Sequence, residues 1–111
     1  MAINSEIKIE DPILEIFRNK LQKRLGSNLK ELWLFGSRAR GDFRNDSDYD
    51  VLVVADGIER NTREIVLEEG YSILDEQQEW IGVIVYSPEH WDRSQNTPLG
   101  LNIVRDGKRI A

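Results

Sequence analysis

Cysteine is absent from this sequence of 111 residues, and histidine occurs only once. The lack of cysteine excludes disulfides, thiolate metal sites and cysteine nucleophiles together, and it fits a reducing compartment. The single histidine, His90, cannot form a zinc site by itself. Long apolar runs are missing too, and charges such as Glu6 and Lys8 interrupt the N-terminal segment. We therefore expect neither a membrane span nor a signal peptide, and a cytoplasmic location.

Positive charge is in deficit, because 15 Lys and Arg stand against 20 Asp and Glu, which gives a net charge of −5. An acidic surface repels phosphates, so we expect no direct binding of nucleic acid. The deficit is uneven: residues 18–44 sum to 8 − 2 = +6 and residues 45–92 to 2 − 13 = −11. The change of sign falls between Gly36 and Asp50. It favours an anion site beside a cation site, with solvated helix faces as the alternative.

The length allows one domain, residues 1–111, and the 40% of hydrophobic residues are enough for a core. The apolar pattern predicts an order of helix, strand, turn, strand, helix, strand, helix, helix, with a four-residue tail after Asp106-Gly107. We expect an α/β or α+β domain with a small three-stranded mixed or antiparallel sheet flanked by helices. The predicted helices begin at Asp11-Pro12, near Glu59, at Ser87-Pro88 and at Thr97-Pro98. The predicted strands are 29–35, 48–54 and 80–86.

Two helix ends are marked by glycine in this pattern. Gly26 is expected to end the first helix. Gly70 is expected to weaken or end the helix that runs from about Glu59 to Leu74, and the end of that helix stays open.

The polar stretch that follows the first strand combines two kinds of site. Gly36-Ser37 lies just past a strand, where glycine lets a phosphate approach the backbone and serine adds a hydroxyl donor. Asp48 and Asp50 stand two apart on the next strand, so both carboxylates point to one face. Two such carboxylates repel each other unless a cation lies between them, and hard oxygen ligands suit Mg²⁺. These two sites meet most simply if the strands are antiparallel.

The residues GSRARG at 36–41, followed by SDYD at 47–50 and an apolar strand, resemble the nucleotidyltransferase signature of the DNA polymerase beta superfamily. Within it, the chain is most similar to the stand-alone minimal nucleotidyltransferases. The resemblance implies that Asp48 and Asp50 hold Mg²⁺ on a nucleoside triphosphate and that Gly36 and Ser37 bind its phosphates. Arg38 and Arg40 are further candidates for phosphate contact, with a solvated turn as the alternative.

One feature of that family has no counterpart in the expected place. A third carboxylate normally lies on the next strand, but positions Gly82 and Ile84 of the segment 80–86 carry none. Glu79 is the nearest acid, and strand alternation puts it on the opposite face unless the strand is bulged or the register differs by one residue.

The resemblance implies the antitoxin of a pair whose toxin is a helical HEPN ribonuclease. The antitoxin would use Mg²⁺ to transfer AMP from ATP to a hydroxyl of the toxin. The missing carboxylate supports a second hypothesis, an antitoxin that is catalytically weak or inactive and acts by binding alone. A transferase acting on a small molecule is a third.

Overall fold

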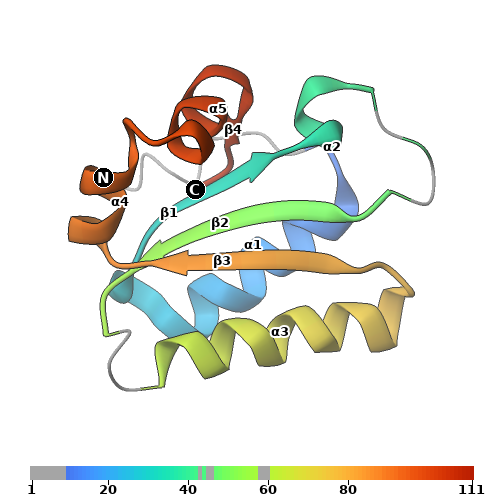
Figure 1. Cartoon of the computed structure of the whole chain (residues 1–111). Helices are drawn as coiled ribbons and strands as arrows, with labels where there is room; N and C mark the ends of the chain where they lie inside the picture. Colours follow the sequence, from blue (N-terminus) through green and yellow to red (C-terminus); the bar gives the residue numbers. More distant parts are fainter. Residues whose placement is uncertain (1–9, 43, 45–46, 58–60) are drawn as a thin grey trace.

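A computed structural model describes residues 10–42, 44, 47–57 and 61–111 (Figure 1). The predicted order of elements is confirmed, with the short helix α2 and the short strand β4 added. Positions 43, 45 and 46 of the predicted turn and the helix start expected near Glu59 lie outside the described residues. The elements are α1 (Pro12–Leu25), the 3₁₀ turn η2 (Gly26–Asn28), β1 (Leu29–Phe35), α2 (Ser37–Arg40), β2 (Tyr49–Ala55), α3 (Thr62–Gln77), β3 (Ile81–Tyr86), α4 (Pro88–Ser94), α5 (Pro98–Asp106) and β4 (Lys108–Arg109).

The described strands form one mixed sheet in the order β3-β2-β1-β4. β1 and β2 are antiparallel, with Phe35 opposite Asp50. This confirms the antiparallel arrangement that the two predicted sites require. β3 runs parallel to β2, and α3 forms the crossover between them. The expected small mixed sheet with flanking helices is therefore confirmed, with four strands in place of three.

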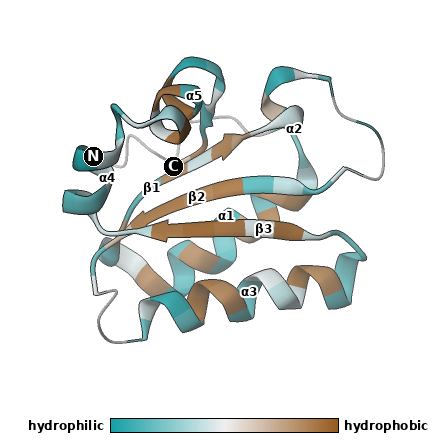
Figure 2. Ribbon diagram, viewed as in Figure 1, coloured by the Kyte–Doolittle hydropathy of each residue, from teal (hydrophilic) through white to brown (hydrophobic). Residues whose placement is uncertain are grey.

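Helices cover both faces of the sheet (Figure 1). α1 and α3 lie on one face, where Val51 and Val53 of β2 pack against Phe17 and Leu21 in the larger core. α4 and α5 lie on the other, where a smaller cluster is formed by Leu52, Val54, Trp91 and Ile103. Figure 2 shows that β2 is hydrophilic where it starts and hydrophobic over the rest of its length. The start of β2, which carries Asp50, is thus the polar end of a strand whose other residues are buried in the core.

The helix starts follow the expected capping chemistry. The Asp11 carboxylate accepts a hydrogen bond of 2.8 Å from the Ile13 amide, and the hydroxyls of Ser87 and Thr97 accept from amides three residues on. Gly26 ends α1 as expected. Gly70 does not end its helix, because α3 continues to Gln77, and the glycine is buried against β3. Packing of α3 on the sheet outweighs the low helix propensity of one glycine. Among the described helices, none is both long and apolar enough to cross a membrane.

The expected tail after Gly107 was wrong. Lys108 and Arg109 pair with β1 as strand β4, and the Ile110 amide donates to the Leu32 carbonyl at 2.7 Å. Ile110 and Ala111 are only 5% and 3% exposed. Four residues of mixed polarity carry no periodic signal, so this pairing depends on β1, which is distant in sequence.

Replacing Ile110 by alanine is expected to destabilise the protein by about 2–4 kcal/mol, because it leaves a cavity in the larger core. Urea unfolding followed by circular dichroism measures the loss. Leu101→Ala on α5 is the control, since this side chain is 53% exposed and its loss should change stability by no more than about 0.5 kcal/mol. Equal stability of the two variants would contradict a structural role for the C-terminal segment.

Candidate functional site

A tight turn joins the end of β1 to the short helix α2. The Gly36 carbonyl accepts from the amides of Ala39 and Arg40, both at 3.1 Å. Ser37 and Arg38 precede Ala39 in the chain, so their amides lie ahead of the first amide that donates to the Gly36 carbonyl. Gly36 has φ 75° and ψ −158°, a conformation that only glycine adopts readily. The turn therefore needs glycine at position 36 for its backbone alone.

Gly36 is also required by the space that Asp50 occupies. Because Phe35 is the register partner of Asp50, the next residue of the chain passes directly over the Asp50 carboxylate. A Cβ atom added at Gly36 would overlap that carboxylate. The missing side chain is what allows the backbone of the turn and the acid of β2 to lie together, so the residues of the two predicted sites meet at this point.

Asp48 directly precedes β2 and Asp50 is its second residue, so strand alternation puts both carboxylates on one face at this end of the strand. Asp48 is exposed and Asp50 half-buried. Burial raises the pKa of the Asp50 carboxyl above its ordinary value, the neighbouring charge of Asp48 raises it further, and Arg40 opposes both. A bound cation would stabilise this pair, because it would remove the repulsion between the two carboxylates and replace the solvation that Asp50 loses on burial.

Tyr49 lies between the two aspartates and points to the opposite face, into the larger core. Its hydroxyl donates to the Asp11 carboxylate at 2.7 Å, and the Arg38 guanidinium lies 3.9 Å from the centre of its ring. Burial, followed by the hydrogen bond to Asp11, raises the Tyr49 pKa. Sequence reasoning missed this anchor, although the alternation in Asp-Tyr-Asp places tyrosine on the core side. The contacts of Tyr49 with Asp11 and Arg38 fix the strand so that the carboxylates of Asp48 and Asp50 face outward.

The two arginines of the turn differ in their surroundings. Arg38 donates from Nε to the Ser47 carbonyl at 3.0 Å and stacks on Tyr49, so it joins α2 to the start of β2. Arg40 is exposed, donates to Asp42 at 3.3 Å and acts electrostatically on Asp50. Phosphate contact stays a prediction for both, and Arg40 is the one whose charge acts on Asp50.

The position of the missing carboxylate can be assigned from the register of β3. Gly82 is the partner of Asp50, and a Cβ atom there would lie 3.7 Å from the Asp50 Oδ1 atom. Ile84 pairs with Leu52, farther from the site. Glu79 acts electrostatically on Tyr49, which points to the other face of the sheet. Gly82 thus occupies the place beside Asp50, and nothing in the described residues brings Glu79 to the aspartates.

The carboxylates of this site fit a magnesium ion whose remaining ligands come from a nucleotide and from water. Among the described residues, no cluster of three or more His, Asp or Glu side chains could form a metal site by itself. Mg²⁺ commonly takes one or two carboxylates and completes its shell with phosphates and water. Asp48 and Asp50 supply those carboxylates, and the turn at Gly36 leaves the backbone open to a phosphate. The ligand roles of these residues remain predictions.

We expect acidification to weaken the binding of Mg²⁺ with ATP. The loss should begin at a higher pH than it would at a site whose aspartate has the ordinary pKa of 3.8. The folded protein holds the Asp50 proton more tightly than the unfolded chain does. The ligand-free protein therefore gains relative stability as the pH falls through the raised pKa, while the metal competes with that proton. Carbon-13 NMR titration of the Asp50 carboxyl measures this pKa. Asp48→Asn should lower it, and an unchanged pKa in that variant would contradict the coupling.

The mixed sheet, the glycine turn after β1 and the two acids at the start of β2 agree with the nucleotidyltransferase resemblance of the sequence. The chain belongs to the nucleotidyltransferase domain family, because the model of that family matches residues 14–101.

One curated relative and two solved structures are similar to this chain, and the solved structures show the likeness of the fold alone. A predicted protein adenylyltransferase of Methanocaldococcus jannaschii is 29% identical over 99 residues, which cover 89% of this chain and 95% of that protein. The fold is similar to that of a toxin–antitoxin complex solved with AMP-PNP, with a TM-score of 0.57, 24% identity and coverage of 86% of this chain and 70% of the other. A complex of a tri-AMPylated HEPN toxin with its MNT antitoxin from Shewanella oneidensis has a TM-score of 0.51, 20% identity and coverage of 89% and 71%.

Proposed function

We propose that this nucleotidyltransferase is an antitoxin that transfers AMP from ATP to a hydroxyl group of a helical HEPN toxin, with Mg²⁺ held by Asp48 and Asp50. The observation that carries the proposal is the contact between the Gly36 turn and Asp50, where a Cβ atom would not fit. It supports the proposal because the backbone proposed to bind phosphate lies against the acid proposed to bind the metal.

Each part of the site has a distinct role in this proposal. The backbone of Gly36 and Ser37 binds the triphosphate, and Arg40 adds positive charge at its edge. Asp48 and Asp50 are the carboxylates that would hold Mg²⁺ beside the phosphates. Mg²⁺, when bound, neutralises charge on the phosphates and stabilises the attacking and leaving oxygens. Tyr49, Asp11 and Arg38 hold the strand and turn in place, which is the positioning that phosphoryl transfer requires.

The transfer itself needs no covalent enzyme intermediate. The acceptor oxygen attacks the α-phosphorus, a new phosphorus–oxygen bond forms, and the bond to the β-phosphate oxygen breaks. Pyrophosphate leaves with the electron pair of the broken bond, and the proton of the acceptor hydroxyl passes to solvent water. Gly82 carries no side chain beside Asp50, so the described part of this chain offers no third carboxylate there to take that proton.

The acceptor protein is proposed from the relatives. The similar structures include toxin–antitoxin complexes, one with an AMP-PNP nucleotide and one with an AMPylated HEPN toxin. The match to the predicted adenylyltransferase covers 89% of this chain and 95% of that relative. The name of the relative gives a protein as the acceptor of the adenylyl group. These likenesses support a protein hydroxyl as the acceptor and a HEPN toxin as the protein.

The test is incubation with α-labelled ATP, Mg²⁺ and a purified candidate partner, namely a HEPN protein whose gene is found next to the gene of this chain. We expect label on the HEPN protein, and none with Asp48→Ala. If label is absent while the Asp48→Ala/Asp50→Ala protein still neutralises the toxin, the enzyme hypothesis fails and inhibition by binding alone replaces it. Label on a small molecule only would point to the third hypothesis.

A binding antitoxin with little or no activity is the second candidate, and Gly82 is the observation that favours it. The prediction that separates the two is Gly82→Asp, because a side chain at this position meets Asp50 at an ordinary contact distance of 3.7 Å. If the missing carboxylate limits the rate, Gly82→Asp should raise transfer by about tenfold or more, within the range of general base catalysis. Gly82→Ala is the control and should leave the rate unchanged. An equal rate in all three proteins would show that the carboxylate is not limiting.

A further inference from the structure

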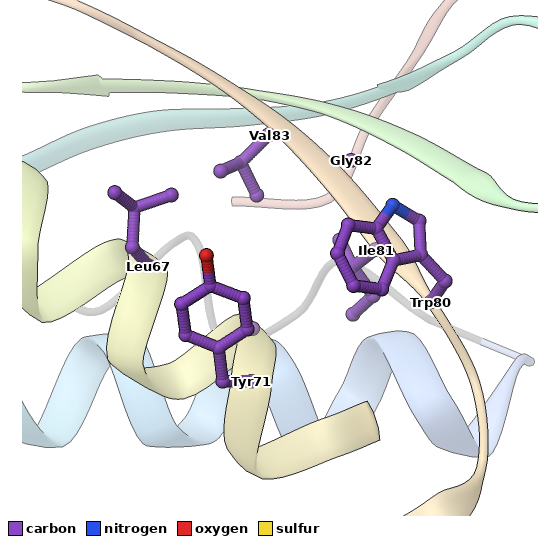
Figure 3. Close-up of a pocket in the computed structure, with 7 residues that line it drawn as sticks. Leu67, Tyr71, Trp80, Ile81, Gly82 and Val83 are labelled. Carbon is purple, nitrogen blue, oxygen red and sulfur yellow. The ribbon is translucent and has the colours of Figure 1, made fainter. Parts of the chain in front are cut away.

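An apolar groove lies between α3 and the outer edge of β3, and Gly82, one of its lining residues, is the register partner of Asp50 (Figure 3). Its volume is about 250 Å³. Tyr71 and Trp80 stand over it with ring centres 6.3 Å apart, and they are 59% and 44% exposed. We define this groove by its lining residues Leu67, Gly70, Tyr71, Trp80, Ile81, Gly82 and Val83.

The floor of the groove is an open strand edge. In the described sheet β3 pairs with β2 alone. The Tyr49 amide donates to the Trp80 carbonyl at 3.0 Å, so alternation turns the backbone groups of Gly82 and Ile84 toward β2. The amides and carbonyls of Ile81 and Val83 therefore point outward, into the groove.

The open edge lacks the devices that usually protect such strands. β3 has the sequence IGVIVY, with no charge and no proline. Arg63 donates to the Val85 carbonyl at 3.3 Å and so covers one end of the edge. Ile81 and Val83 remain as a short segment to which a further strand could be added.

Acidic residues surround this segment. Glu64 lies one helical turn before Leu67, and Asp75 one turn after Tyr71, so both lie on the groove side of α3. Glu68, by contrast, is paired with Arg24 on α1 at 2.9 Å. Glu79 directly precedes Trp80, and the segment 45–92 that contains the groove has a net charge of −11. The charges favour a cationic occupant.

We propose that the groove binds an extended, lysine- or arginine-rich segment of a partner protein, which adds a strand to β3 at Ile81 and Val83. An apolar side chain of that segment would insert between Leu67 and Tyr71, and its cations would meet Glu64 and Asp75. A second copy of this chain fits less well, because pairing two β3 edges would bring the acidic α3 helices of both copies together. This surface goes beyond the proposed transfer and needs neither ATP nor Mg²⁺.

The test uses a short peptide in which lysine alternates with valine, added to the full chain without nucleotide. NMR should show binding, with slower hydrogen exchange at the Ile81 and Val83 amides and a shift of the Trp80 indole signal. A peptide with glutamate in place of lysine should bind at least about fivefold more weakly. Equal binding of the two peptides, or no protection of these amides, would overturn the proposal.

Variants locate the surface. Asp75→Lys should weaken binding of the lysine peptide by about fivefold, whereas Asp92→Lys, a change at another exposed aspartate on α4, should not. Leu67→Ser with Tyr71→Ser should also weaken it, and Leu101→Ser with Val104→Ser on α5 is the matched control. If the free protein is a dimer by sedimentation and its Ile81 and Val83 amides are already protected, a second copy fills the groove and the proposal fails. Loss of AMP transfer would not alter any of these results.

Discussion

Replacing Asp50 by asparagine is expected to lower the rate of AMP transfer by about a hundredfold to a thousandfold. The half-buried Asp50 carboxylate lies against the Gly36 turn, which is proposed to bind the phosphates, and it is proposed to hold the metal together with Asp48. Asparagine keeps the shape of the side chain and removes its charge. Single-turnover transfer of α-labelled AMP at saturating Mg²⁺ measures the effect on the chemical step.

Asp56→Asn is the matched control for this change. Asp56 stands just past the other end of β2 and forms an exposed ion pair with Lys30 at 3.4 Å. Its loss should leave transfer unchanged and alter stability by about 0–1 kcal/mol. Equal transfer by the Asp50→Asn protein and the parent would show that the chemistry lies elsewhere.

Replacing Gly36 by alanine is expected to abolish ATP binding and to destabilise the protein by about 1–3 kcal/mol. Two effects combine, because the backbone conformation with φ 75° and ψ −158° disfavours a side chain and the added Cβ would overlap the Asp50 carboxylate. Relief of that overlap must move the turn, the acid or both. Isothermal titration with ATP and Mg²⁺, together with thermal unfolding, measures the two losses.

Gly41→Ala separates conformation from overlap. Gly41 also has a positive φ, of 88°, but a Cβ atom there meets nothing within 4 Å. This variant should lose a little stability and keep its affinity for ATP. If both variants lose ATP binding equally, the approach of Gly36 to Asp50 is not what forms the site.

The sequence was most informative where structure is local. Asp11, Ser87 and Thr97 each cap a helix within three residues, and the spacing of Asp48 and Asp50 determines their shared face. The antiparallel pairing of β1 and β2 could be inferred because the two strands are neighbours in the chain. The glycine turn could be inferred as well, although its contact with Asp50 needed the register.

Features that depend on distant pairing were not predictable. Lys108 and Arg109 form a strand only because β1 offers an edge. The choice between Gly82 and Ile84 as neighbour of Asp50 depended on the parallel register across α3. The helix through Gly70 depended on packing against β3, and the position of Arg38 depended on the Tyr49 ring. In each case a tertiary contact decided between local alternatives.

The hairpin of β1 and β2 contains every residue proposed to hold the nucleotide or the metal. Residues 29–55 therefore close only a short loop to form the site, at a small cost in chain entropy. β3 and β4 must each cross a longer stretch of chain to reach the sheet, so their pairing is expected to come later in folding. The site would thus be laid out early, and the later elements would give it rigidity.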